Sequence, residues 1–417
     1  MLQRTKFAGI LLITLFLISG MVVGCSASGN EQVEENDVED VVITIGNLTD
    51  KTGVSSGPVS IIDTALEDMV EYYNDENLIP GVKLKIIAYD GQCDPSRSIP
   101  GYESLIARGA DFIWVPLPPS VPPLKERADE DKYVLFAATA NMDSAELEGG
   151  YIFSLGVSPE FEAYTLLEWI AENHEGFPQG RPARIGGAAW EDAYSNIWFA
   201  AARKYVEANP DKYVWEGDFQ TELKFSWDRE IEALKDCDYV YSPVPPHVFV
   251  DDFRDVAGEK ATLIGTEVHC AFMGLIENNE LWDELDGSLY IRVTPWYHET
   301  GPMIDLINQL LTTKHSPVEA EMFKDDGVTY LSAKQAYLML DIVRKAVEKA
   351  GPENFDSQAL YEAATSWSFE MEGIEDFCSF TDKKRMSQNY YSVYEASGAD
   401  RNLYRVSDWM YQVTEPK

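Results

Sequence analysis

Three residues with reactive side chains follow a predicted strand near the middle of the chain. The segment ATLIGTEVHCAF, residues 261–272, starts as an apolar run and then carries Glu267, His269 and Cys270 within four positions. These residue types can bind a metal ion, take part in catalysis or hold a charged ligand. In an extended strand Glu267 and His269 share one face while Cys270 points away, and the chain has only five histidines to complete a metal site. We therefore expect no metal here and interpret Glu267 as a candidate ligand-binding acid.

We expect none of three enzyme motifs in this chain: the GxSxG elbow of serine hydrolases, the HExxH zinc motif and the GxGxxG dinucleotide fingerprint. There is no HExxH zinc motif, and GNLTDKTG after the first predicted strand does not fit the GxGxxG dinucleotide fingerprint. We expect a protein that binds its ligand without turnover and without a cofactor.

The first 40 residues have the pattern of an export signal followed by a tether. Arg4 and Lys6 precede an apolar stretch at 7–23, as in a secretory signal, although an uncleaved membrane anchor is the alternative. The residues VVGC at 22–25 resemble a bacterial lipobox, in which a lipid is attached to the cysteine. Residues 26–40 are acidic and carry no aromatic side chain, so they cannot bury a core. We predict a signal peptide at 1–24, lipid attachment at Cys25 and a flexible linker at 25–40.

Segments typical of strands and helices alternate through the rest of the chain. Apolar runs such as VVITIGNLTD, VKLKIIAYD and ATLIGTEV favour buried strands, and apolar residues recur at helical spacing between them. The alternation predicts an α/β fold of parallel sheets covered by helices. The remaining length is too great for one ordinary core, so we expect two similar lobes.

The formal net charge of −38 argues against a nucleic acid partner, because such a chain repels phosphate backbones. The acidic surface is interpreted as a source of solubility.

Ligands of open α/β sheets bind beyond the carboxyl ends of the strands. Applied to this sequence, that rule selects the loops at 47–56, 89–94, 116–120, 137–141, 190–194, 242–247 and 265–270. Glu267 lies in the last of these loops.

Four segments, in this order, carry a family resemblance. They are YDGQCDPSRS at 89–98, AWEDAYSNIWFAAARKYVEA at 189–208, LIGTEV at 263–268 and FCSFTDKKRMSQNYYSVYEA at 377–396. Together they resemble the periplasmic ligand-binding proteins of ABC importers, especially the branched-chain amino-acid type, which binds leucine, isoleucine and valine. The resemblance implies the type 1 binding-protein fold, with two Rossmann-like lobes joined by three crossovers. Lobe one would comprise residues 41–156 plus 296–373, and lobe two residues 157–295 plus 374–417.

The resemblance also implies a set of ligand-binding residues. Lobe two would supply Tyr194 and Glu267, and a crossover would supply Trp296 as an aromatic wall. From lobe one, hydroxyls and backbone N–H groups at Ser120, Thr139, Ala140 and Asn141 would face them. The alternative for Glu267 is a surface carboxylate after a strand, and for Tyr194 and Trp296 it is packing without ligand contact. For the first-lobe residues the alternative is ordinary turn chemistry.

Two departures from the family pattern bear on the ligand. The family's serine-rich loop is replaced by PLPPSVPP at 116–123, and proline has no N–H to donate. The position of the usual disulfide partner of Cys93 falls near Leu117, so that bridge cannot form.

The implied function is that of a monomeric solute-binding lipoprotein outside the cytoplasm. It would close on a small organic molecule, such as an amino acid, an amide or a related compound, and deliver it to an ABC permease in the membrane. A sensory protein that reports ligand occupancy to a membrane receptor is the alternative.

Overall fold

The computed structural model describes residues 40–222 and 226–416. The predicted signal peptide, the lipidation site at Cys25 and nearly all of the linker lie outside the described residues. Within the two described ranges no helix is long and apolar enough to cross a membrane.

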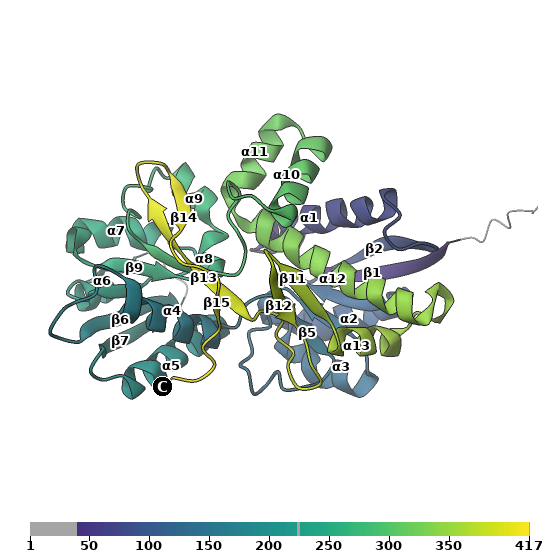
Figure 1. Cartoon of the computed structure of the whole chain (residues 1–417), viewed down its shortest axis with the longest axis horizontal. Coiled ribbons are helices and arrows are strands. Elements are labelled where there is room, and N and C mark those ends of the chain that lie inside the picture. The colour runs from purple at the N-terminus through teal and green to yellow at the C-terminus, as the bar shows by residue number, and fades with distance from the viewer. Residues whose placement is uncertain (1–39, 223–225, 417) are drawn as a thin grey trace, which may run out of the picture. The chain divides into compact units, whose positions relative to one another are not determined.

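The first lobe is built on a sheet in which every strand is parallel to its neighbours (Figure 1). The strand order is β2-β1-β3-β4-β5. The strands are β1 (Val41–Thr49), β2 (Val82–Asp90), β3 (Phe112–Val115), β4 (Leu135–Ala137) and β5 (Ile152–Ser154). Helices connect β1 to β2, β2 to β3 and β3 to β4, whereas residues 138–151 between β4 and β5 form a long loop without a helix.

The second lobe has a mixed sheet with the order β14-β13-β10-β9-β8-β6-β7 and β15 paired to β13. Pairing is parallel from β7 to β10 and antiparallel around β13. Its strands are β6 (Ala183–Trp190), β7 (Tyr213–Thr221), β8 (Tyr239–Tyr241), β9 (Thr262–Gly265), β10 (Leu289–Arg292), β13 (Tyr390–Ser397), β14 (Asn402–Arg405) and β15 (Met410–Tyr411). The predicted α/β class with two lobes is confirmed.

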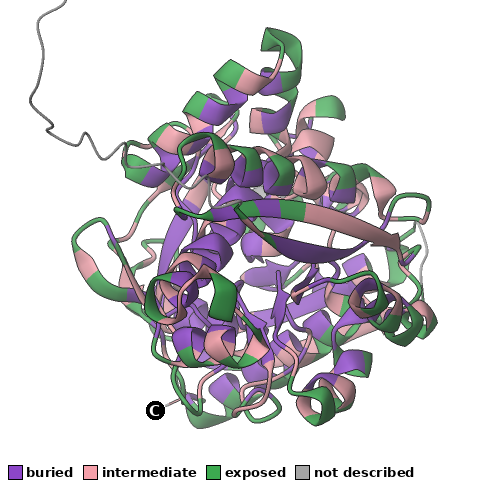
Figure 2. Ribbon diagram, turned by 90° about the vertical axis from the view of Figure 1, so that its right-hand side faces the viewer, coloured by how far each residue is buried: buried purple, intermediate pink, exposed green. Residues whose placement is uncertain are grey.

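Helices pack on both sheets, and Figure 2 shows helices with buried residues on their inner sides and exposed residues on their outer sides. In the first lobe these are α1 (Ser56–Asp75), α2 (Ser98–Ala107), α3 (Lys125–Asp131), α10 (Pro302–Lys314), α11 (Pro317–Asp326), α12 (Val328–Ala350) and α13 (Ser357–Thr365). In the second lobe they are α4 (Pro159–Asn173), α5 (Ala193–Ala208), α6 (Asp228–Leu234), α7 (His247–Ala257), α8 (Glu267–Cys270) and α9 (Met273–Asn278). The long helix α12 packs along α1 against the first sheet, because its stripe of apolar residues is buried there.

The chain passes between the lobes three times. The first crossover joins β5 to α4, the second joins β10 to α10, and the third joins the hairpin strand β12 to β13. These three segments bring residues from distant parts of the sequence together and therefore form the hinge region.

The third crossover begins later than the predicted lobe boundary at residue 374. Strand β12 (Ile374–Ser379) pairs with β11 (Ser368–Met371), and Phe377 packs in the core of the first lobe. The predicted pair of strands around the polar turn at 381–385 does form, but the two strands join different sheets. Apolar contact with Phe153 and Trp367 holds Phe380 in the first lobe.

Two glycines are needed where the backbones of different segments approach closely. A Cβ at Gly156 in the first crossover would lie 1.9 Å from the carbonyl oxygen of Ala138. A Cβ at Gly327, which has a φ of 83°, would lie 2.1 Å from the carbonyl oxygen of Cys270. Any larger residue at either position would push the two segments apart.

Candidate functional site

Glu267 begins a short helix and does not continue the strand. Strand β9 ends at Gly265, and residues 267–270 form the single turn α8 with Thr266 as its N-cap. The prediction of an extended chain through Val268 was therefore wrong at its end. The cause is local capping chemistry: the Thr266 N–H donates to Nδ1 of His269 at 3.0 Å and stops the strand.

The carboxylate of Glu267 is buried and has two partners inside the protein. Its side chain is 1% exposed, and Oε1 lies 3.2 Å from Nη2 of Arg292 in an ion pair. Oε2 accepts a hydrogen bond of 2.7 Å from the backbone N–H of Val293, the first residue after β10. Glu267 thus connects the end of one strand of the second lobe to the second crossover.

Tyr194 lies in the same network as Glu267. The Tyr194 hydroxyl donates a short hydrogen bond to Glu162 and lies 3.0 Å from Oγ1 of Thr266. The other carboxyl oxygen of Glu162 accepts the backbone N–H of Glu267 at 3.1 Å. Burial raises the pKa of Glu162 well above its ordinary value, and the neighbouring Glu267 raises it further. We call these four residues, Glu162, Tyr194, Thr266 and Glu267, the buried polar cluster.

His269 and Cys270 do not form a metal site. Nδ1 of His269 accepts the Thr266 N–H, so Nε2 carries the proton and donates to the Ser242 carbonyl oxygen at 2.9 Å. Burial lowers the pKa of His269 to about 4, which keeps the ring neutral. Within the described ranges no group of three or more His, Cys, Asp or Glu residues could hold a metal ion.

Trp296 packs against Arg292. The guanidinium carbon of Arg292 lies 4.6 Å from the Trp296 ring centre and 5.4 Å from the Tyr394 ring centre. Nε1 of Trp296 donates to Asn402 at 2.7 Å. Although burial alone would lower it, the pKa of Arg292 is raised above its ordinary value by the carboxylate of Glu267. Trp296, at 1% exposure, thus packs against a buried cation.

The candidates of the first lobe lie at the carboxyl ends of β3 and β4. Ser120 ends a 3-10 turn, Pro118–Ser120, formed by the proline-rich loop. The Thr139 hydroxyl donates to the Ala138 carbonyl oxygen at 2.9 Å, and Ala140 is buried. Asn141 has a φ of 52°, and its Oδ1 is buried without a hydrogen-bond partner among the described residues. No hydrogen bond in the described part of the chain joins Ser120, Thr139 or Asn141 to Tyr194, Glu267 or Trp296.

Lys334 and Gln388 connect all three crossovers. Nζ of Lys334, on helix α12, donates to the carbonyl oxygen of Val293 at 2.5 Å and to Oε1 of Gln388 at 3.3 Å. Nε2 of Gln388 donates to the carbonyl oxygen of Leu155 at 2.7 Å. Leu155, Val293 and Gln388 belong to the first, second and third crossovers. We call these three residues and Lys334 the hinge junction.

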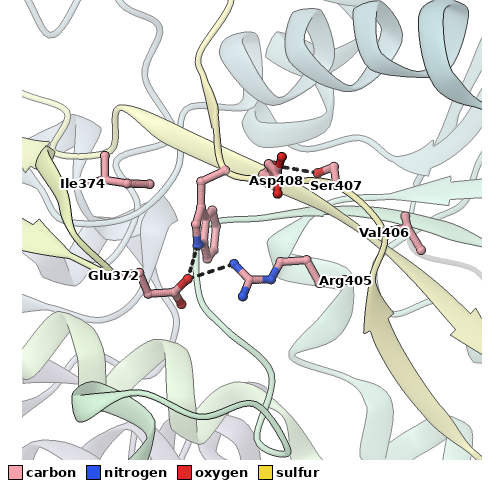
Figure 3. Close-up of a pocket in the computed structure, with 7 residues that line it drawn as sticks. Glu372, Ile374, Arg405, Val406, Ser407 and Asp408 are labelled. Atoms are coloured by element: carbon pink, nitrogen blue, oxygen red, sulfur yellow. Dashed lines mark hydrogen bonds and ion pairs between the residues drawn. The ribbon is translucent and has the colours of Figure 1, made fainter.

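A second set of contacts links the lobes nearer the surface (Figure 3). Arg405 contacts Glu299 at 2.8 Å and Glu372 at 3.0 Å, and the Trp409 indole N–H donates to Glu372 at 2.8 Å. Glu372 belongs to the β11–β12 turn, and Arg405 and Trp409 belong to the C-terminal segment. Four of these side chains, Glu299, Glu372, Arg405 and Trp409, form what we call the outer clasp. A pocket of about 700 Å³ lies beside it and is lined by Glu372, Arg405 and Trp409 among others.

Ser55 has the spacing of a hydrolase nucleophile, because GVSSG at 53–57 matches GxSxG. Its hydroxyl lies 3.3 Å from Sγ of Cys93. No histidine hydrogen-bonds to it within residues 40–222 and 226–416, so the match has no catalytic base. Cys93, Cys237, Cys270 and Cys378 are all free thiols.

Comparisons with known proteins agree with this architecture. Residues 42–221 match the family model described as periplasmic binding protein. The structure is similar to that of a branched-chain amino acid ABC transporter protein from Thermus thermophilus with bound valine, with a TM-score of 0.73, 18% identity, and coverage of 89% of this chain and 96% of that chain. The chain has the type 1 periplasmic binding protein fold.

Other proteins with this fold are similar at the same level. A fatty acid ABC transporter substrate-binding protein from Thermomonospora curvata has a TM-score of 0.71 at 16% identity, covering 89% of this chain and 92% of its own. A solute-binding protein of an ABC transporter from Rhodopseudomonas palustris BisB5, in complex with 3,4-dihydroxybenzoic acid, has a TM-score of 0.70 at 15% identity, covering 90% and 98%. No curated protein matches the sequence significantly. The predicted resemblance to type 1 periplasmic binding proteins is confirmed.

Sequence reasoning missed four residues that organise the hinge of this periplasmic binding protein fold. They are Glu162, Arg292, Lys334 and Gln388. Two of them could have been recognised in the sequence. Arg292 interrupts the apolar run LYIRV, and Lys334 is a charged residue among the buried positions of α12. A long charged side chain in a buried stripe is rare unless it is paired, and it therefore marks an internal polar network.

Proposed function

We propose that this protein captures a small organic solute between its two lobes and delivers it to an ABC permease. The proposal rests on one observation: polar groups lie at the strand ends and at the crossovers of a type 1 periplasmic binding protein fold. Solutes of open α/β sheets bind at such strand ends, and closure would bring the two sheets' ends around the solute. Binding alone, without chemical change of the solute, is the proposed activity.

Each lobe is proposed to supply part of the solute contact. In the first lobe Ser120, Thr139, Ala140 and Asn141 would offer hydroxyl, amide and backbone groups. Asn141 is the strongest of these candidates, since its buried Oδ1 lacks a hydrogen-bond partner in the described part of the chain and an unpaired buried polar atom costs about 1–3 kcal/mol.

The second lobe and its crossover would supply the remaining contacts. Glu267 has its carboxylate fixed by Arg292 and Val293, which prepares it to accept one more hydrogen bond from an N–H or O–H of the solute. Tyr194 would hold Glu267 in place through Glu162. Trp296 would limit the size of the site.

The solute class is proposed from the chemistry of the site and from similar proteins. An amino acid, an amide or a related small organic compound fits a site with few polar groups and buried aromatic rings. Similar structures contain valine, 3,4-dihydroxybenzoic acid or 4-hydroxybenzoate. All three compounds carry a carboxyl group on a small apolar body.

The protein is further proposed to act outside the cytoplasm as a lipid-anchored monomer. The lipobox-like residues at 22–25 support attachment at Cys25. Blocking lipoprotein signal processing with globomycin should leave a larger precursor that retains its signal. Normal maturation in the presence of the inhibitor would contradict lipidation.

A thermal-shift screen tests solute capture, because a ligand that binds only the folded state raises the unfolding midpoint. The panel would hold amino acids, their amides, and aliphatic and aromatic acids, each at about 100 times a micromolar Kd, where a stabilisation of roughly 2.7 kcal/mol is expected. Calorimetric titration would then confirm one site per chain. If no compound of the panel shifts the midpoint, the proposed function is contradicted.

The Asn141→Gly variant tests the location of the site. Glycine keeps the left-handed backbone that Asn141 adopts, so the variant removes only the amide. Affinity for the compound found in the screen should fall about tenfold, as expected for one lost hydrogen bond in a buried site. Asn173→Gly, at an exposed position of α4, is the control and should leave affinity unchanged.

A further inference from the structure

A cavity in the first lobe lies apart from the proposed solute site. It has a volume of about 400 Å³ and is enclosed by the start of α10, the middle of α12 and the β11–β12 hairpin. Helix α10 follows the second crossover, and the hairpin precedes the third. No residue proposed to contact the solute is among the described residues that line this cavity. We call it the first-lobe cavity.

The walls of the first-lobe cavity are apolar. They are formed by Pro302, Met303, Leu306, Tyr337, Phe369 and Met371. The ring centres of Tyr337 and Phe369 lie 5.9 Å apart in an edge-to-face arrangement, and Met303 and Met371 are each 7% exposed. Unbranched methionine side chains adapt to the shape of a ligand. The cavity therefore has the size and the lining that are typical of a site for a small organic molecule.

The charged groups that line the first-lobe cavity are acidic. They are Glu370 and Glu372, and no Lys, Arg or His of the described residues lines it. The side chain of Glu370 has no ion pair or hydrogen bond within residues 40–222 and 226–416. Arg405 and Trp409 both contact Oε2 of Glu372, so Oε1 has no hydrogen-bond partner in the described part of the chain. Carboxylate oxygens at this cavity are therefore available to a ligand.

A tight turn fixes the position of Glu372. Glu372 and Gly373 connect the paired residues Met371 and Ile374 of the hairpin, and their φ angles are 53° and 78°. Positive φ at both central residues is the geometry of a type I′ turn, which matches the twist of the two strands. Glu372 lines both the first-lobe cavity and the pocket beside the outer clasp. The turn thus holds one carboxylate between the two, with one oxygen in the clasp.

We propose that the first-lobe cavity is a second ligand site, which binds an amphipathic organic cation with one ammonium group on an apolar or aromatic body. The body would lie among the methionines and the aromatic rings, and the ammonium group would contact Glu370 and Oε1 of Glu372. The rings of Tyr337 and Phe369 would attract the positive charge further. A neutral compound of the same shape lacks these charge contacts, and an anion is repelled by the two carboxylates.

Matched probes separate charge from shape. Calorimetric titration at about pH 7 would compare 4-phenylbutylamine, 4-phenylbutanamide and 4-phenylbutanoate, with any solute found in the thermal-shift screen present at saturation. The amine should bind about tenfold more tightly than the amide, as expected for two partly exposed ion pairs, and the acid should bind most weakly. High salt should reduce the advantage of the amine. Equal or tighter binding of the amide or the acid, or binding of no probe, overturns the proposal and leaves solute capture to its own screen.

Two variants then locate the bound amine. Glu370→Gln should reduce the amine-to-amide ratio of affinities about threefold, the share of one of the two carboxylates. Glu375→Gln, at an exposed position of the same hairpin, is the matched control and should leave the ratio unchanged. Leu306→Trp fills the cavity and should weaken the amine and the amide alike by about tenfold or more, since it removes the space for the apolar body. Unchanged binding in Glu370→Gln contradicts the proposal, and that variant decides the question if Leu306→Trp does not fold.

Discussion

The lobes are connected by two sets of polar contacts that differ mainly in burial. Around the hinge junction, Glu267, Arg292 and Lys334 are at most 1% exposed. In the outer clasp, the side chains of Arg405 and Glu372 are 26% and 24% exposed. Ion-pair geometry is similar in both, at 3.2 Å for Glu267–Arg292 and 3.0 Å for Arg405–Glu372. Because the two sets differ mainly in their access to solvent, the buried set should contribute more to the stability of the hinge than the exposed set.

The largest expected effect follows from removing Arg292. Arg292→Met leaves Glu267 buried without its cation, which should lower the free energy of unfolding by about 3–5 kcal/mol. Urea unfolding measures this loss. Arg401→Met, which breaks an exposed pair with Glu277, is the control and should cost at most about 1 kcal/mol. Equal losses in the two variants would contradict the comparison.

The same pair should show strong coupling. The double variant Glu267→Gln with Arg292→Met removes both charges and should regain part of the stability lost in Arg292→Met. Simple addition of the two single losses would show that the pair does not act as a unit.

A smaller effect is expected from the amide of the hinge junction. Gln388→Met keeps the side-chain length but removes one hydrogen bond from the Leu155 carbonyl oxygen and one from the Lys334 ammonium. The first group keeps the Ser387 hydroxyl as a partner and the second keeps the Val293 carbonyl oxygen. We expect the free energy of unfolding to fall by about 1–3 kcal/mol. Gln358→Met, at an exposed position of α13, should change it by less than about 0.5 kcal/mol. If the two variants are equally stable, Gln388 does not contribute to the stability of the hinge.

Glu162 makes the buried set sensitive to pH. Burial raises the pKa of Glu162 in the folded protein above the ordinary 4.5 of the unfolded chain. At pH values between 4.5 and the raised pKa, the folded state therefore binds more protons than the unfolded state. Stability should therefore fall as pH rises through that window, by up to about 1.4 kcal/mol per pH unit. Glu162→Gln should remove this decline in urea unfolding measured between about pH 5 and 7, whereas Glu172→Gln, on the exposed side of α4, should preserve it. A decline that persists in Glu162→Gln would assign it to another group.

The smallest expected effect lies in the outer clasp. Arg405→Met breaks two partly exposed ion pairs and should lower the free energy of unfolding by about 1 kcal/mol or less. The loss should shrink further in high salt, which screens exposed charges more than buried ones. A salt-independent loss of several kcal/mol would show that the outer clasp contributes as much to the free energy of unfolding as the buried contacts do.

Much of the fold could be predicted from the sequence because its signals are local. Apolar runs and helical spacing predict the strands of both sheets and the long helix α12, which begins four residues before the predicted start at Ser332. Helix α11 was not predicted, since its sequence, PVEAEMFKDD, buries only Ala320 and Phe323. The turn α8 was also missed, because a capping interaction between Thr266 and His269 outweighs the strand pattern.

The candidate site could be predicted only in part, because the residues that contact one another in it are distant in sequence. Glu267 and Tyr194 were expected near each other, and both lie in the buried polar cluster. Their link through Glu162 joins residues 105 positions apart. Likewise, the contact of Lys334 with Val293 depends on how the crossovers pack. Sequence spacing carries no information about such contacts.

The hinge junction also has a consequence for the order of folding. The contact from Gln388 to Leu155 spans 233 positions, so it closes a loop containing the whole second sheet up to β10. Contacts of such long range form late, since the loop-closure entropy must be overcome first. One core cluster lies in the first lobe and another in the second, and both can assemble earlier, whereas a third cluster contains residues of both lobes. The two halves of the molecule should therefore fold before they are joined, and the ability to close on a solute should be the last property that the folding chain acquires.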